Sequence, residues 1–221
     1  EGTVSHMAKR TNLRIGTSSW TAKGWEKAFY PAGTKPADFI AHYAARYNVV
    51  EVDASFYAIP SAAALNNWRS RTPAGFLFAA KAPQIITHEK FLTDCQDDVT
   101  AFLKAMSSLG EKLGPLLFQF PYFAKSKGVT REDFQRRLER FLPLLPTGDF
   151  RFAVEVRNKA WLDAPLIDLL TSHNVCLVLI DHPWMAPPGE LFSKQRIMTS
   201  NFAYVRWLGD RRKIEGMKEE I

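Results

Sequence analysis

The segment RFAVEVRN, residues 151–158, has an acidic and a basic residue near its end. Phe152, Val154 and Val156 alternate in it with Ala153, Glu155 and Arg157. This period of two predicts a β-strand. The alternation therefore places a carboxylate and a guanidinium on one face of the strand. Such a pair can move a proton or hold an anion, and we interpret it as one strand's share of a polar pocket.

Other short apolar segments also end in residues that could do chemistry. They contribute Trp20; Asp53 and Tyr57; Lys81 and His88; Gln119; Asp181 and His182; and Arg206. The active sites of β/α barrels lie at the mouth where the carboxyl ends of the parallel strands converge. We therefore expect these residues to share a pocket with Glu155 and Arg157.

Alternation also predicts which of these side chains point inward. Each polar residue shares its face with an apolar neighbour on the same strand: Lys81 with Ala79, Gln119 with Leu117, Glu155 with Ala153, and Asp181 with Leu179. We take that face as the barrel interior. A buried carboxylate is costly without a partner, so the cations at Lys81, Arg157 and Arg206 are expected to compensate Glu155.

The elements that must position these residues are strands and helices in alternation. Seven apolar segments of β character begin at Leu13, Val49, Phe76, Pro115, Arg151, Val175 and Phe202, and their starts are 24 to 39 residues apart. Helical patterns fill the gaps over 36–47, 61–70, 97–110, 130–142, 164–173 and 190–198. Alternation of this kind predicts an α/β fold with a parallel sheet, and we expect a TIM-type (β/α)8 barrel. Seven strands are recognisable, and an eighth unit is expected to be missing from this chain.

Length and composition favour one globular domain. The chain has 221 residues, 46% of them hydrophobic, which is enough for a sizeable core. We expect a single barrel domain over 13–221, preceded by a tag remnant and disordered N-terminus at 1–12. No stretch has the length and apolarity of a membrane span, and no signal peptide is visible. Cys95 and Cys176 lack metal-type spacing, so the prediction is a cytoplasmic protein with reduced thiols.

The ordered set IGTSSWTAKGWEKAFYP, VVEVDASFYAIPS, FAAKAPQIITH, LGPLLFQFP, FAVEVRNKAW and YVRWLG resembles one known family. It is similar to domain of unknown function family 72, also called YecE-like, from about Leu13 to Gly209. The resemblance implies a TIM-type barrel and supplies no activity. Family members usually read Asn-Ser-Thr where this chain has Asp53, Ala54 and Ser55. They also continue past YVRWLG to a last strand that is absent here.

Three functions remain open, and the first is an enzyme with a metal-independent acid/base pocket for an anionic substrate. The candidate catalytic residues are Glu155, Lys81, His88 and Asp181, and the candidate substrate-binding residues are Trp20, Asp53, Tyr57, Gln119, Arg157 and Arg206. Glu155 would act as general acid or base, and Lys81 and Arg157 would hold a phosphate or carboxylate. The net charge of +6 weakly favours an anionic small molecule or nucleotide. No cofactor is predicted.

The second function is a metal-dependent phosphodiesterase resembling the endonuclease IV barrels. Its ligands would be Asp53, Glu155, Asp181 and His182, although neighbouring cations would compete for the carboxylates.

The third function is a non-enzymatic protein that binds nucleic acid or phosphate. The basic cluster GDRRK at 209–213 is its better candidate surface. No P-loop, Rossmann fingerprint or nucleophile elbow is present. The sequence therefore does not support NAD binding, ATP binding by a P-loop or a lipase-like hydrolase.

Overall fold

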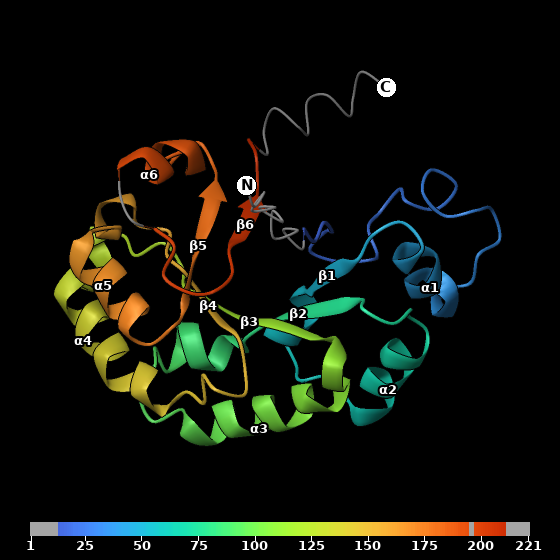
Figure 1. The fold of residues 1–221 in the computed structure, drawn as a ribbon, viewed down its shortest axis with the longest axis horizontal. Helices are drawn as coiled ribbons and strands as arrows, with labels where there is room; N and C mark the ends of the chain where they lie inside the picture. Colours follow the sequence, from blue (N-terminus) through green and yellow to red (C-terminus); the bar gives the residue numbers. More distant parts are fainter. Residues whose placement is uncertain (1–12, 195–196, 211–221) are drawn as a thin grey trace, which may run out of the picture.

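The structure is a computed structural model that describes residues 13–194 and 197–210. Six parallel strands form one sheet in sequence order. They are β1 (Val49–Val52), β2 (Leu77–Lys81), β3 (Leu113–Gln119), β4 (Phe152–Glu155), β5 (Cys176–Asp181) and β6 (Tyr204–Trp207). The sheet curls into a half barrel, so that β1 and β6 face each other across its concave side (Figure 1).

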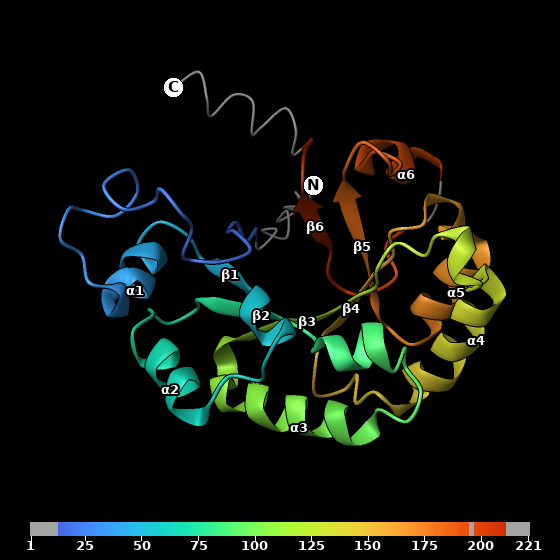
Figure 2. The ribbon, with the colours of Figure 1, turned by 180° about the vertical axis from the view of Figure 1, so that it is seen from behind.

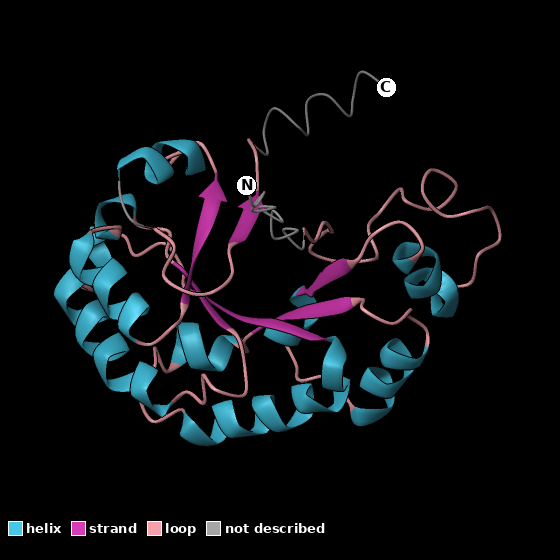
Figure 3. Ribbon diagram, in the orientation of Figure 1, coloured by secondary structure: helices cyan, strands magenta, loops and turns pink. Residues whose placement is uncertain are grey.

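In the described part of the chain, one α-helix precedes β1 and five further α-helices connect successive strands. In chain order they are α1 (Phe39–Ala44), α2 (Ala62–Ser70), α3 (Gln96–Met106), α4 (Arg131–Phe141), α5 (Ala164–Ser172) and α6 (Pro188–Lys194). Helices α2 to α5 cover the convex side of the sheet when the molecule is seen from behind (Figure 2). This layering of helices outside a parallel sheet is clear where strands and helices are coloured separately (Figure 3). Among the described residues, no helix has the length and apolarity needed to cross a membrane.

Local sequence signals explain where the helices begin and end. The Ser61 hydroxyl accepts a hydrogen bond from the Ala64 N–H at 3.2 Å and caps α2. Thr130 and Asp133 form a capping box at the start of α4. Gly110 has a φ of 57° and ends the helical run that follows α3, because glycine adopts this backbone conformation without a steric penalty.

The two faces of the sheet have different environments. Phe78, Phe118 and Phe152 belong to the large core between the sheet and the helices. Leu117 and Ala153, one position away on the same strands, belong to a smaller apolar cluster on the concave face. Because strand side chains alternate between faces, the next concave-face residues after these two are Gln119 and Glu155. The sheet therefore has an apolar floor on its concave face, and polar residues follow at the strand ends.

The predicted strand over residues 13–20 does not form. The segment runs beside β1, but the N–H of Thr17 donates to the Tyr43 hydroxyl at 2.7 Å and makes no ladder bond. The N–H of Glu51 donates to the Thr17 carbonyl at 2.9 Å and keeps the segment against β1. A side chain thus replaces one of the backbone partners that strand pairing requires.

The strand count therefore differs from that expected for the TIM-type barrel. The described residues hold six strands where the sequence predicts seven, and β6 pairs with β5 alone. The expected absence of an eighth unit is not confirmed, since residues 211–221 lie outside the described residues. The predicted tag remnant at 1–12 also lies outside them. The predicted helix over 190–198 is shorter than expected, because α6 ends at Lys194.

Gly16 makes the approach of the first segment to β1 possible. A Cβ built at Gly16 would lie 1.8 Å from the Val49 carbonyl oxygen, whereas one at Gly148 would meet nothing within 4 Å. We expect Gly16→Ala to destabilise the fold by about 1–3 kcal/mol, because the segment must move away from β1. Gly148→Ala is the control and should leave stability nearly unchanged. Urea denaturation of both variants checks this, and equal midpoints would contradict it.

Candidate functional site

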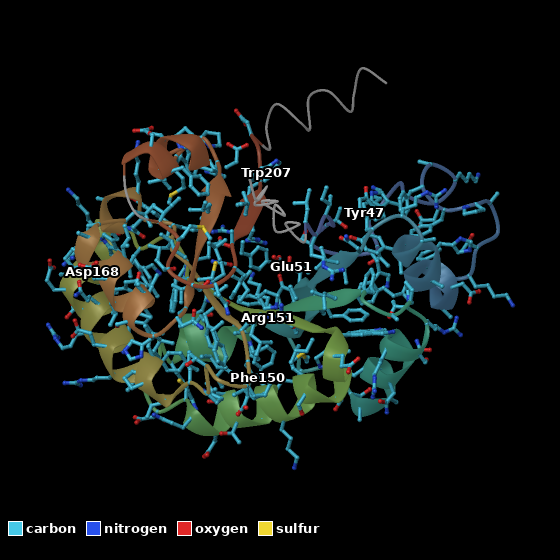
Figure 4. The ribbon with its side chains drawn as sticks, in the orientation of Figure 1. Tyr47, Glu51, Phe150, Arg151, Asp168 and Trp207 are labelled. Atoms are coloured by element: carbon cyan, nitrogen blue, oxygen red, sulfur yellow. The ribbon has the colours of Figure 1, made fainter. Side chains whose placement is uncertain are left out.

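Arg206 of β6 joins two carboxylates from other strands inside the half barrel. One terminal nitrogen donates to Glu155 Oε2 of β4 at 2.6 Å, and the other donates to Glu51 Oε1 of β1 at 2.7 Å. Glu51 lies in the concave interior between β1 and β6 (Figure 4). Since no backbone bond joins β6 to β1 in the described sheet, Arg206 connects these two strands through side chains.

Glu155 is fully buried and holds two arginines. Its second oxygen, Oε1, accepts a hydrogen bond from the Arg157 Nε at 2.9 Å. Both carboxylate oxygens are therefore engaged by guanidinium groups. Such charge-assisted bonds are short and strong, and they offset the cost of burying the carboxylate. The terminal nitrogens of Arg157 have no hydrogen-bond partner in the described part of the chain, and its side chain is 39% exposed.

Glu51 and Tyr204 complete the buried network. The Tyr204 hydroxyl donates to Glu51 Oε2 within 2.5 Å. Burial raises the pKa of Glu51 above its ordinary value, although Arg206 and Tyr204 both act to lower it. Burial and the Glu51 charge raise the pKa of Tyr204 well above its ordinary value, so its phenol stays protonated. Burial by itself would lower the pKa of Arg206, but the two glutamates raise it, and the guanidinium stays charged.

Lys81 ends β2 beside this network. Its Nζ lies 3.7 Å from Asp53 Oδ1 and 3.9 Å from the centre of the Phe56 ring. Asp53 and Phe56 belong to the short 3-10 helix η2 (Asp53–Phe56), which follows β1 directly. The Ser55 hydroxyl contacts the carbonyls of Val52 and Lys81, each at 2.7 Å, which ties the two strand ends together. Burial lowers the pKa of Lys81, as do the charges of the two arginines, while Asp53 and Glu155 oppose this change.

His88 and Lys81 both pack against the Phe56 ring. His88 belongs to η3 (Ile85–Glu89), a single π-helical turn of a kind often found at functional sites. Its ring packs edge-on against Phe56, with the ring centres 4.9 Å apart, and its Nδ1 is 2.8 Å from the Thr87 hydroxyl oxygen. Burial lowers the pKa of His88 first, and the charges of Lys81 and Arg157 lower it further. The imidazole is therefore neutral at pH 7.

The structure brings together six of the ten candidate catalytic and substrate-binding residues and leaves four outside the group. Asp53, Lys81, His88, Glu155, Arg157 and Arg206 form the cluster described above, which we call the mouth cluster, together with Glu51 and Tyr204. Trp20, Tyr57 and Asp181 lie outside it. Gln119 is the strand partner of Glu155, but its amide donates to the Phe120 carbonyl and to no side chain of the cluster within the described ranges.

Asp181 shares its face of β5 with Leu179, as predicted, but that face is not the interior. Leu179 packs into the core between sheet and helices, and Asp181 is exposed. The strand partner of Asp181 is Trp207, whereas Arg206, which points inward, pairs with Ile180. The expectation that Asp181 points into the barrel is therefore wrong. Alternation predicts which residues of a strand share a face, but it does not predict which of the two faces lies inside the barrel.

The other three residues have structural or exposed positions. Trp20 packs edge-on against Trp68 of α2, with ring centres 5.0 Å apart. The Gln119 amide is buried and donates to the Phe120 carbonyl. Tyr57 is 77% exposed and contacts Phe56.

Two members of the mouth cluster were not among the predicted site residues. Glu51 lies two residues before Asp53, and Tyr204 lies two residues before Arg206. The period of two along a strand places each of them on the same face as its partner and could have found both. Across the described parts of the chain, no three carboxylate, imidazole or thiol groups gather closely enough to hold a metal ion. Glu51 and Glu155 instead contact guanidinium groups.

The fold and the mouth cluster define a parallel α/β half barrel with a polar, charged site at its strand ends. The chain belongs to the family described as protein of unknown function DUF72, which matches residues 14–220. The resemblance seen in the sequence is thereby confirmed. The family has no assigned activity.

Two curated relatives have the family name UPF0759. The chain is 31% identical to YecE of Escherichia coli K12 over 146 residues, which are 66% of this chain and 48% of YecE. It is 29% identical to YunF of Bacillus subtilis over 213 residues, which are 89% of this chain and 70% of YunF. The chain thus spans about half the length of YecE.

Solved structures share the fold. A DUF72 family protein from Thermotoga maritima is 24% identical with a TM-score of 0.69, and the match covers 94% of this chain and 85% of that one. A DUF72 family protein from Enterococcus faecalis is 22% identical with a TM-score of 0.67, covering 90% and 71% of the two chains.

Removing Arg206 should be strongly destabilising. Arg206→Ala leaves Glu51 and Glu155 buried without their shared counter-ion, and breaking a buried pair costs about 3–5 kcal/mol. Arg71→Ala, which breaks the exposed Arg71–Asp38 pair, should cost less than about 1 kcal/mol. Urea denaturation measures both. A cost for Arg206→Ala as small as that for Arg71→Ala would show that the buried bridge does not hold the fold.

The pKa of His88 should depend on its cationic neighbours. Lys81→Met removes a positive charge that disfavours the imidazolium, so the pKa of His88 should rise toward its ordinary value. An NMR titration of the His88 ring protons measures the change. Lys104→Met, which removes an exposed positive charge from α3, is the control and should leave the His88 titration unchanged. An unchanged His88 titration in Lys81→Met would show that the charge of Lys81 does not act on His88.

Proposed function

We propose that the mouth cluster binds a small anionic molecule and carries out acid–base chemistry on it with side chains alone. The observation that carries this proposal is the position of Arg157. Glu155 holds its Nε, while its terminal nitrogens lack a partner in the described ranges and its side chain is 39% exposed. A guanidinium fixed at one end and free at the other is suited to a carboxylate or phosphate, which it can contact with two parallel hydrogen bonds.

Glu155 has a different role in this proposal from the general base that the sequence suggests. Both of its oxygens accept hydrogen bonds from arginines, so neither is free to take a proton from a substrate. Glu155 orients Arg157 toward the ligand and balances the charge of Arg206. The same commitment makes Glu51 and Glu155 poor metal ligands, because a metal would have to displace Arg206 from both.

The groups that could move a proton are His88 and Lys81. His88 is neutral at pH 7 and can accept a proton. Because the charges of Lys81 and Arg157 lower its pKa, the protonated ring would release that proton readily. Burial brings the pKa of Lys81 down toward the range in which an amine acts in catalysis. Both lie within the electrostatic reach of Arg157, so an anion bound there would be close to them.

Loss of Arg157 should weaken anion binding. Arg157→Ala is expected to raise the Kd for inorganic phosphate and for pyruvate roughly ten- to a hundredfold. This is the change in affinity that corresponds to the loss of one hydrogen bond to a charged group. Lys104→Ala removes one exposed positive charge from α3 and is the control for net charge. Isothermal titration calorimetry measures both variants. Equal weakening in the two would mean that only the overall charge matters and would overturn the proposal.

A further inference from the structure

Lys81 is a largely buried amine with no hydrogen bond. Its side chain is 12% exposed, and its Nζ donates no hydrogen bond to any residue in the described part of the chain. Other lysines are engaged: the Nζ of Lys112 donates to the carbonyls of Arg69 and Thr72 at 2.6 and 2.5 Å, and Lys90 donates to Asp98 at 2.6 Å. The stem of Lys81 is buried, but its Nζ keeps access to solvent, so a small molecule can reach the amine.

Asp53 faces Lys81 with an oxygen that is also unsatisfied. Its Oδ1 is buried and accepts no hydrogen bond, and the 3.7 Å to Lys81 Nζ is beyond hydrogen-bond distance. The two groups are therefore held close together without bonding each other. A reacting atom attached to Nζ could take or give a proton at Asp53 after a small movement.

Besides Asp53, the charges around Lys81 come from three elements. Glu155 and Arg157 lie at the end of β4, Arg206 on β6, and His88 on η3. The two arginines oppose a positive charge on Nζ, and the carboxylates of Asp53 and Glu155 favour it. With burial added, the pKa of Lys81 is lowered, which raises the fraction of neutral amine. The Phe56 ring covers one side of Nζ at 3.9 Å.

We propose that Lys81 is a nucleophile that forms an imine with a small molecule carrying both an aldehyde or ketone carbonyl and an anionic group. An amine on a buried stem, next to cationic groups, is the arrangement that activates lysine for this chemistry. The proposal rests on the proposed function through Arg157, which would hold the anionic group while the carbonyl carbon meets Nζ.

The reaction balances without any oxidant or further reactant. The Nζ lone pair forms a bond to the carbonyl carbon while the π pair moves to oxygen. One proton then passes from nitrogen to that oxygen to give a neutral carbinolamine. Nitrogen then forms the second bond to carbon while the hydroxyl leaves as water, with one proton passing from nitrogen to that oxygen. The products are an imine and one water. Asp53 is placed to carry the proton, because its free oxygen is 3.7 Å from Nζ.

Reductive trapping tests the proposal. The full chain is incubated with pyruvate and sodium borohydride, which reduces an imine to a stable amine, and the modified lysines are found by peptide mass spectrometry. Lys81 should be labelled at least roughly tenfold more than Lys90, whose pKa is raised by its bond to Asp98 and which is an internal control in the same sample. Propionate, which lacks the ketone, should compete with pyruvate for the site and leave no label.

Variants separate the imine from the anion site. Lys81→Arg keeps the positive charge, so it should still bind pyruvate in calorimetry while the label at position 81 is lost. Asp53→Asn should slow labelling of Lys81 severalfold with little change in pyruvate affinity. Pyruvate binding with no preference for Lys81 over Lys90 would overturn the imine and leave the anion site standing. Failure of pyruvate and phosphate to bind the unmodified protein would overturn the proposed function as well.

Discussion

The bridge that Arg206 makes between Glu51 and Glu155 is the contact on which the site depends. The sheet is curled but its ends are not joined by backbone pairing in the described structure, so side chains must hold β1 and β6 across the interior. A guanidinium suits this task because its fork can donate to two carboxylates in different directions. The geometry of the bridge also fixes Glu155, and Glu155 fixes Arg157. Through these contacts, Arg206 of the edge strand β6 determines the position of Arg157, which is the more exposed of the two arginines.

Burial explains why the same residues have both a structural and a chemical character. Carboxylates and guanidinium groups lose hydration inside the half barrel, and they are tolerated because each of them has a charged partner. Lys81 and Asp53 lie beside this satisfied network, yet they do not bond each other. The network is therefore rigid where charges are joined by hydrogen bonds. The ion pair of Lys81 and Asp53 at 3.7 Å leaves one amine and one carboxylate oxygen without a hydrogen bond. Such a division between supporting and available groups is typical of sites that bind or react.

Much of the fold could be predicted from the sequence, and the site only in part. Alternating strands and helices and the caps at Ser61 and Thr130 follow from local patterns, which need no knowledge of distant contacts. The first predicted strand failed because the Tyr43 hydroxyl, from a helix, supplies a bond that pairing would have supplied. Asp181 was misplaced because a period of two does not say which face is inside. Glu51 and Tyr204 were missed although they share strand faces with Asp53 and Arg206, since their contact joins residues more than 150 positions apart.

The mouth cluster has a consequence for proton linkage. Its ionisable groups include three carboxylates, from Glu51, Asp53 and Glu155, and three basic groups, from Lys81, Arg157 and Arg206. With all six ionised, the formal charges cancel. An arriving anion adds an uncompensated negative charge to a region with little solvent. That charge stabilises protons on His88 and on Lys81, whose pKa values are lowered in the empty site. Anion binding and proton uptake are thereby coupled thermodynamically, and the protein should release protons to the medium when the anion departs.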